Sequence, residues 1–249
     1  MKCLNCGGDL DFTSDGKYRC PFCRKVFSKL EIENVPTRQN LKYGDDKGIN
    51  VFDKNINGIA EITADNSLGS GFLIDKDEGL IITNAHVVLK NSKPASKVTV
   101  KIVNQNINAD ILVYAESDID DPQRGVDLAL LKLKTVPYEA VELKLENFDN
   151  VRTGEKIYII GNSEGEGTCI TSGIVSDKLR PANRQMLMMT DCPTNPGNSG
   201  GPVFNEKGKV IGVHVAGKRE SKGMAYEIPS STVAKFLKDF PKYAAKMYR

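Results

Sequence analysis

Short apolar runs separated by turn-forming residues cover the chain from about residue 49 to residue 229. No long helical periodicity interrupts these runs. Many short strands at this spacing favour a β-sandwich or a pair of β-barrels over alternating strands and helices. The pattern therefore predicts a mainly β domain with strands at Ile59–Ile62, Gly71–Ile74, Leu80–Thr83, Val98–Val103, Ile111–Tyr114, Leu128–Leu133, Lys156–Ile160, Ile170–Val175, Met186–Thr190, Val203–Phe204, Val210–Val215 and Ala225–Ile228.

The apolar spacing changes after Pro229. Serine residues there precede apolar positions at i, i+3, i+4 and i+7, which are Val233, Phe236, Leu237 and Phe240. A serine cap followed by this spacing is typical of a helix start. The sequence therefore predicts a C-terminal helix over about residues 231–247.

The first 28 residues form a separate unit that is rich in cysteine. Two CxxC pairs at this separation are the ligand pattern of a structural zinc site, and short strand-like pieces at Tyr18–Arg19 and Lys25–Phe27 flank the second pair. The unit resembles a zinc ribbon with the metal ligands Cys3, Cys6, Cys20 and Cys23. Because so small a unit has little core, zinc would supply most of its folding energy, on the order of 10 kcal/mol or more. The polar residues 29–48 that follow predict a linker.

Composition and charge bear on location and partners. No apolar signal core follows Lys2, and no apolar run approaches the roughly 18 residues that a membrane helix needs. We therefore expect a soluble cytoplasmic protein without a membrane partner. A disulfide framework or a redox pair remains the alternative interpretation of the CxxC pairs, and Cys169 and Cys192 are expected to be free thiols. The formal charge of +2 gives no electrostatic argument for nucleic acid as the main partner.

Ser199 stands among three glycines and two prolines in the run from Asn195 to Pro202. Acyl transfer needs an exposed hydroxyl beside backbone N–H groups that converge on one point, and glycines permit the tight backbone that turns those groups outward. A plain polar turn is the alternative interpretation. The run therefore makes Ser199 a candidate nucleophile.

The chain has only two histidines, His86 and His214, so any imidazole chemistry must use one of them. His86 ends one apolar run and opens another, which predicts a partly buried ring that stays neutral near pH 7 and acts as a base. A core histidine bonded to a carbonyl is the alternative. Asp127 borders an aliphatic run, where a carboxylate is costly to bury unless it is paired. Orienting a histidine through Nδ1–H would explain Asp127, and an exposed aspartate at a strand end is the alternative.

Three motifs follow one another along the chain: Thr-Asn-Ala-His at 83–86, Asp-Leu-Ala-Leu-Leu-Lys-Leu at 127–133 and Gly-Asn-Ser-Gly-Gly-Pro at 197–202. With Gly-Ser-Gly-Phe at 69–72, they resemble the trypsin-like serine peptidases, and most closely their HtrA-type branch. The resemblance covers roughly residues 49–240. It implies a peptidase domain over residues 49–249, built of two six-stranded antiparallel β-barrels at about 49–145 and 150–229.

The resemblance also implies roles for single residues. Ser199 would be the nucleophile of a serine endopeptidase that forms a covalent acyl-enzyme, His86 its base, and Asp127 the group that orients His86. The backbone N–H groups of Gly197 and Ser199 would form the oxyanion hole. Asn198 cannot pair with a new N-terminus as an aspartate would, which predicts activity without zymogen cleavage. No cofactor would be needed for catalysis.

The substrate pocket also follows from the resemblance. Its floor would lie at Pro193, and neither Pro193 nor Thr194 is an acid, so cleavage after lysine or arginine is not expected. Small or medium apolar residues are expected before the scissile bond. His214 would not be catalytic, because it lies in the strand that pairs with substrate backbone. The predicted substrate-binding residues are Pro193, Thr194, Val213, His214, Val215 and Tyr226.

Two other functions stay open from the sequence. One is a catalytically silent adaptor that binds peptides through a peptidase fold. The other is an effector whose zinc ribbon docks a protein or nucleic-acid partner. Since the ribbon has only a small excess of basic residues, a nucleic-acid partner is the weaker expectation. Peptides or proteins are the expected substrates, and the ribbon is the expected site for a protein partner.

Overall fold

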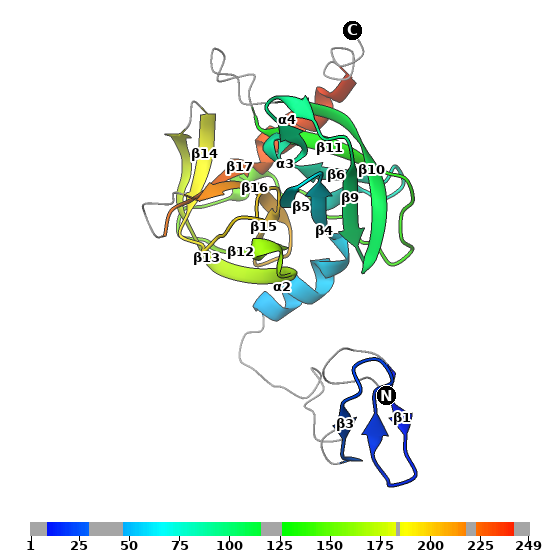
Figure 1. Cartoon of the computed structure of the whole chain (residues 1–249). Helices are drawn as coiled ribbons and strands as arrows, with labels where there is room; N and C mark the ends of the chain where they lie inside the picture. The colour runs from blue at the N-terminus through cyan, green and yellow to red at the C-terminus, as the bar shows by residue number, and fades with distance from the viewer. Residues whose placement is uncertain (1–8, 30–46, 116–125, 183–184, 218–222, 242–249) are drawn as a thin grey trace. The chain divides into compact units, whose positions relative to one another are not determined.

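The computed structural model describes residues 9–29, 47–115, 126–182, 185–217 and 223–241. Its backbone contacts divide the chain into two units, residues 1–46 and residues 47–249 (Figure 1). The second unit begins at Lys47, two residues before the start that the sequence predicts for the peptidase domain.

The first unit contains a small antiparallel sheet. Strand β2 (Tyr18–Arg19) lies between β1 (Asp11–Phe12) and β3 (Val26–Phe27). Strands β2 and β3 fall on the two pieces predicted beside the second CxxC pair. Strands of two residues bury little apolar surface, so this sheet needs a further source of stability.

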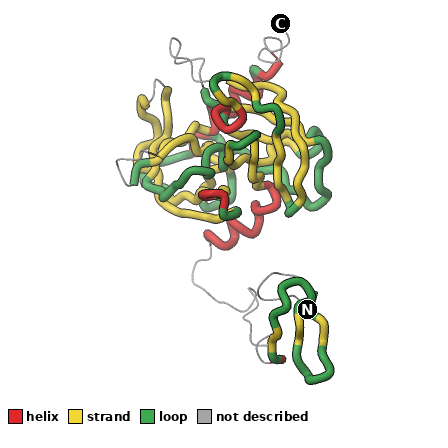
Figure 2. Tube along the Cα trace, viewed as in Figure 1, coloured by secondary structure: helices red, strands yellow, loops and turns green. Residues whose placement is uncertain are grey.

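The second unit consists of two closed antiparallel barrels, and Figure 2 shows how strongly strands dominate it. The first barrel has the strand order β10-β11-β6-β5-β4-β9, and the second has the order β12-β13-β14-β17-β16-β15. The first contains β4 (Ile59–Ala64), β5 (Ser67–Asp75), β6 (Leu80–Thr83), β9 (Val98–Ile102), β10 (Gln105–Ala115) and β11 (Leu128–Leu133). The second contains β12 (Lys156–Asn162), β13 (Thr168–Ala182), β14 (Gln185–Thr190), β15 (Pro202–Asn205), β16 (Val210–Gly217) and β17 (Ala225–Pro229). The predicted pair of six-stranded barrels is confirmed, and each of the twelve predicted runs overlaps one of these strands.

Several strands are buried on both faces, which explains why their apolar runs do not alternate strictly. In β6, Ile81 packs into the core of the first barrel. The next residue, Ile82, packs into a second cluster that also contains Ile160 and Phe204 of the second barrel. A third cluster, with Ile159 and its neighbours, fills the second barrel. The two barrels are therefore joined by a shared apolar core, which holds their facing loops in fixed register.

Helix α2 (Lys47–Asn55) is a correction to the sequence analysis, which places the end of a linker and the start of the β pattern here. Gly48, Asn50 and Asp53 give the segment weak helix propensity, so local pattern does not reveal it. The helix is held by tertiary contacts instead. Val51 is buried, and a Cβ on Gly48 would lie 3.0 Å from the Tyr158 ring of β12.

The predicted C-terminal helix is present as α4 (Ser230–Lys238), with Val233 and Phe236 buried. Asp239 forms a turn, and residues 242–247 of the predicted helix lie outside the described residues. None of the helices in the described ranges has the length and apolar character needed to cross a bilayer. The remaining short elements are α3 (Ala85–Val88), β7 (Leu89–Lys90), β8 (Lys93–Pro94) and the 3₁₀ turns η2 (Ile56–Gly58), η3 (Phe148–Asn150) and η4 (Ser163–Gly165).

Candidate active site

His86 lies on the one-turn helix α3, directly after strand β6. Asn84 precedes the helix in an extended conformation, and its side-chain amide donates a 2.9 Å hydrogen bond to the Asp127 carbonyl. The side chain of His86 is 48% exposed, so the ring is more open to solvent than its apolar neighbours in the sequence predict.

Asp127 holds His86 through both carboxylate oxygens. Oδ2 lies 2.7 Å from His86 Nδ1, and Oδ1 accepts a 3.0 Å hydrogen bond from the His86 backbone N–H. Asp127 has a φ of +44°, an uncommon left-handed conformation for a residue with a side chain. Because an ionised carboxylate only accepts hydrogen bonds, this contact places a proton on Nδ1 of His86. In the neutral ring, that tautomer leaves the Nε2 lone pair available to act as a base.

Ser199 lies in the turn between β14 and β15, and we refer to residues 195–201 as the nucleophile turn. Its backbone is held from both barrels: the Ser70 N–H donates to the Ser199 carbonyl at 2.8 Å, and the Gly200 N–H donates to the His214 carbonyl at 2.8 Å. The Ser199 hydroxyl itself donates to the Val215 carbonyl over 3.5 Å. Within the described residues it makes no hydrogen bond to His86.

Close backbone packing brings the nucleophile turn beside the helix that carries His86. A Cβ on Gly69 would lie 2.6 Å from the Val87 side chain and 3.2 Å from the Ser199 carbonyl, so both groups occupy the space that a side chain at residue 69 would need. A Cβ on Gly200 would lie 3.0 Å from the Asn84 backbone nitrogen. Only glycine permits such approaches. The three residues of the predicted triad thus come from α3, from the position directly before β11 and from the nucleophile turn, and they gather in one region.

The nucleophile turn also presents backbone donors. The Pro196 carbonyl accepts a 2.7 Å hydrogen bond from the Glu164 N–H. Because a trans peptide places C=O and N–H on opposite sides, this bond turns the Gly197 N–H away from Glu164. Within the described part of the chain, neither the Gly197 N–H nor the Ser199 N–H donates to another group. Two N–H groups left unused beside a hydroxyl are the arrangement that an oxyanion requires.

The predicted pocket residues differ in how accessible they are. Pro193 is exposed, while Thr194, Val215 and Tyr226 are half-buried. Val213 is fully buried in the core between the barrels. The buried His214 does not face solvent but pairs with a carboxylate, as described next.

Two functional candidates escape the sequence analysis. Glu227, in strand β17, is fully buried and lies 2.9 Å from His214 Nδ1. A single acid inside the apolar run Ala225–Ile228 is a signal that could have identified it. Ser70 is also fully buried, and its hydroxyl donates to the Gly197 carbonyl at 2.7 Å. Nothing in its sequence neighbourhood distinguishes this serine from a turn residue between glycines.

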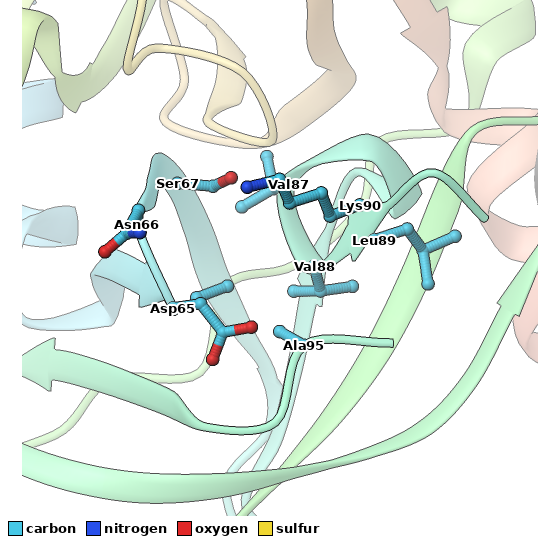
Figure 3. Close-up of a pocket in the computed structure, with 9 residues that line it drawn as sticks. Asp65, Asn66, Ser67, Val87, Val88, Leu89, Lys90 and Ala95 are labelled. Atoms are coloured by element: carbon cyan, nitrogen blue, oxygen red, sulfur yellow. The ribbon is translucent and has the colours of Figure 1, made fainter. Parts of the chain in front are cut away.

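A small pocket of about 160 Å³ is lined in part by the end of α3 and by β7 (Figure 3). Val87, Val88 and Leu89 give it apolar walls immediately after His86 in the chain. The turn Asp65–Ser67 and Lys90 add polar groups at its edge.

The cysteines of the first unit are only partly described. Cys20 is fully buried and Cys23 is half-buried, in a turn closed by hydrogen bonds from Arg24 N to Cys20 O and from Cys20 N to Lys25 O, both 2.9 Å. The other two predicted ligands, Cys3 and Cys6, lie outside the described residues. The described ranges alone therefore hold no set of three metal-binding side chains. None of the described residues of this unit belongs to an apolar core cluster, so no such core accounts for the burial of Cys20. A buried thiolate is the kind of ligand that a structural zinc site takes.

Comparison with known proteins decides the family. The trypsin-like peptidase domain matches residues 69–213, more than half of the chain. A curated protein of Pseudomonas fulva (strain 12-X), named probable periplasmic serine endoprotease DegP-like, is 37% identical over 189 residues, which are 74% of this chain and 36% of the relative. The chain belongs to the trypsin-like peptidases of the HtrA/DegP type.

Other relatives of the HtrA type agree. Human serine protease HTRA3 is 34% identical over 70% of this chain and 38% of its own length. The solved structure of the HtrA-type protease AlgW with tripeptide superposes with a TM-score of 0.65 at 27% identity, over 77% of this chain and 62% of that one. The chain spans only about a third of the length of the curated relatives that it matches.

Proposed function

We propose that this HtrA-type chain is an active serine endopeptidase that cleaves peptide bonds through a covalent acyl-enzyme. The observation that carries the proposal is the Asp127–His86 pair beside a nucleophile turn whose two N–H groups are unused. A fold can persist without its chemistry. An imidazole oriented by a carboxylate, together with backbone N–H groups that have no other acceptor, is however the machinery that acyl transfer needs.

In the proposed reaction, the Ser199 oxygen attacks the substrate carbonyl while His86 Nε2 takes the hydroxyl proton. The resulting oxyanion accepts hydrogen bonds from the Gly197 and Ser199 N–H groups. His86 then gives the proton to the leaving amine as the C–N bond breaks, which leaves the acyl-enzyme on Ser199. Water next attacks the acyl carbon while His86 takes its proton, and His86 returns that proton to Ser199 as the acid is released. Asp127 stabilises the imidazolium throughout. The Ser199 hydroxyl must first leave the Val215 carbonyl, which a rotation about its Cα–Cβ bond achieves.

For specificity, we propose a preference for small or medium apolar residues before the scissile bond. The support is the absence of an acid at Pro193 and Thr194 and the half-buried apolar surface of Val215 and Tyr226. The solved relative AlgW is described with a tripeptide, which supports peptides as the ligand class for this chain. A panel of peptides that differ only at that residue measures the preference.

For the first unit, we propose a structural zinc ribbon that docks a protein partner. The support is the burial of Cys20, directly after the two-residue strand β2, together with the exposed rings of Phe12 and Phe22. Zinc would be held by Cys3, Cys6, Cys20 and Cys23 and would fix the turns of the ribbon. The cytoplasmic location stays a prediction.

A fluorophosphonate probe tests the activity, since it reacts with a serine hydroxyl that the active site has made nucleophilic and not with ordinary serines. We expect labelling of the native chain and none of Ser199→Ala or His86→Ala. Ser172→Ala, which removes an exposed hydroxyl on β13, is the matched control and keeps full labelling. A folded native chain that does not label would instead support the catalytically silent adaptor.

A further inference from the structure

The second histidine also forms a carboxylate pair, and this pair is buried. His214 is 2% exposed and Glu227 is not exposed at all. Glu227 Oε2 lies 2.9 Å from His214 Nδ1, and Glu227 Oε1 accepts a 2.9 Å hydrogen bond from the Thr190 hydroxyl. The three residues lie on the neighbouring strands β14, β17 and β16, and we call them the buried triad.

Stability alone gives a weak reason for the buried triad. A carboxylate and an imidazole lose their hydration when they are buried, and apolar residues of similar volume are often at least as stabilising. The strands around the triad are filled by such residues, including Met188 and Ile211. In some proteins, a polar group kept in an apolar core specifies one arrangement of the packed elements rather than adding to stability.

The arrangement that it fixes is a β-bulge beside the nucleophile. In the pairing of β16 with β17, His214 lies opposite Glu227, but Ala216 lies opposite Tyr226. Val215 is therefore the extra residue on β16. Its carbonyl is released from the ladder and accepts the hydrogen bond from the Ser199 hydroxyl. The buried triad thus lies at the pairing step immediately before this bulge.

The backbone of His214 also forms two hydrogen bonds with the nucleophile turn. Its N–H donates to the Gly201 carbonyl at 2.9 Å, and its carbonyl accepts from the Gly200 N–H at 2.8 Å. Ser199 is the next residue toward the N-terminus. A shift of His214 would therefore move the turn that carries the nucleophile.

We propose that His214, held by Glu227 and Thr190, is a positioning residue that fixes the β16 bulge and with it Ser199. The inference rests on the proposed peptidase function. His214 acts through its own backbone and through Val215, and it takes no proton from Ser199. A misplacement of about 1 Å from a remote change can cost roughly 10²-fold in rate, so the effect on acylation is expected to be large.

The test compares labelling rate with stability in the full chain. His214→Leu combined with Glu227→Leu removes both polar groups and leaves no unpaired charge. We expect it to melt within a few degrees of native yet to react with the fluorophosphonate about 10²-fold more slowly. His214→Asn keeps an N–H donor for Glu227 and should retain most of the native rate. Thr190→Val, a change of similar shape, should slow labelling to a smaller extent.

Ser230→Ala is the matched control. Ser230 is 1% exposed, and its hydroxyl donates to the Glu146 carbonyl at 2.9 Å, away from the nucleophile turn. Its loss should lower stability but leave the labelling rate unchanged. If the native chain labels and the double variant labels equally fast, the positioning role is overturned but the proposed peptidase function is not. The same holds if Thr190→Val labels at the native rate. Absence of labelling in the native chain overturns the proposed function and this inference with it.

Discussion

The hydroxyl of Ser70, in the first barrel, donates a 2.7 Å hydrogen bond to the Gly197 carbonyl in the nucleophile turn of the second barrel. The same hydroxyl accepts a 2.8 Å hydrogen bond from the Asn162 N–H, and the Ser70 N–H donates to the Ser199 carbonyl. One buried residue thus holds the turn on both sides of the nucleophile. The shape of the nucleophile turn therefore depends on the contact between the barrels as well as on the turn itself.

Replacing Ser70 by alanine should impair both folding and reactivity. The change leaves the Gly197 carbonyl and the Asn162 N–H buried without their partner, which costs about 1–3 kcal/mol. Since the Gly197–Asn198 peptide, which lies between the two oxyanion donors, is then free to turn, labelling by a fluorophosphonate should slow as well. Urea unfolding and labelling rates measure the two effects. A variant that loses stability but labels at the native rate would show that Ser70 does not position the nucleophile turn.

Gly197→Ala should abolish most of the reactivity. Gly197 has a φ of +96°, and a Cβ there would lie 2.1 Å from the Asn162 carbonyl oxygen, so the turn must move. Loss of one oxyanion donor typically costs 10²–10³ in rate, and we expect a fall of about that size.

Gly154→Ala is a close control for the previous change. Gly154 has a similar φ of +86° but open space around its Cβ position. It should cost roughly 1 kcal/mol of stability through backbone strain and leave labelling intact. Equal labelling of both alanine variants would refute the role of the Gly197 N–H.

Asp127→Asn should keep the fold and lose the reaction. An amide in place of the carboxylate favours the wrong tautomer of His86, and the corresponding change in the general triad scheme lowers the rate about 10⁴-fold. Labelling kinetics measure the loss. Asp110→Asn, an exposed aspartate on β10 of the same barrel, is the control and should react at the native rate. A fast Asp127→Asn variant would remove Asp127 from the mechanism.

Motif and spacing were sufficient for the twelve strands, because each is marked by an apolar run between turn residues. They also led to His86, Asp127 and Ser199, whose catalytic roles stay a prediction. They did not reveal α2, whose residues are helical only because the second barrel packs against them. They also missed Ser70 and Glu227, whose partners lie far away in the sequence and become neighbours only when the barrels close. The sequence also did not predict that the ring of His86 is half-exposed. Apolar neighbours in the chain do not show which face of α3 meets solvent.

The thiol of Cys192 provides a prediction for alkaline pH. Burial raises its pKa from the ordinary 9.0 to about 11, and the nearby charge of Glu227 acts in the same direction, against a hydrogen bond with Thr171. The unfolded chain therefore releases this proton more easily than the folded chain. The contribution of the protonated Cys192 thiol to the free energy of unfolding is therefore complete below pH 9 and is lost as the pH rises toward 11. Native protein should lose on the order of 2 kcal/mol more than Cys192→Ala across this window. Parallel pH profiles of the two unfolding free energies would contradict the raised pKa.

The ribbon prediction can be tested by its metal. If Cys3, Cys6, Cys20 and Cys23 bind zinc, the purified chain should contain about one zinc per molecule, and Cys20→Ser should lose it. Because metal binding supplies the folding energy of such a unit, a chelator should make residues 1–28 sensitive to protease. The second unit has its own cores, so its melting and its fluorophosphonate labelling should survive the chelator. Cys169→Ser, in strand β13, is the control and should keep the metal. A chain without zinc whose four N-terminal cysteines resist alkylation until reduced would identify disulfides in place of the metal.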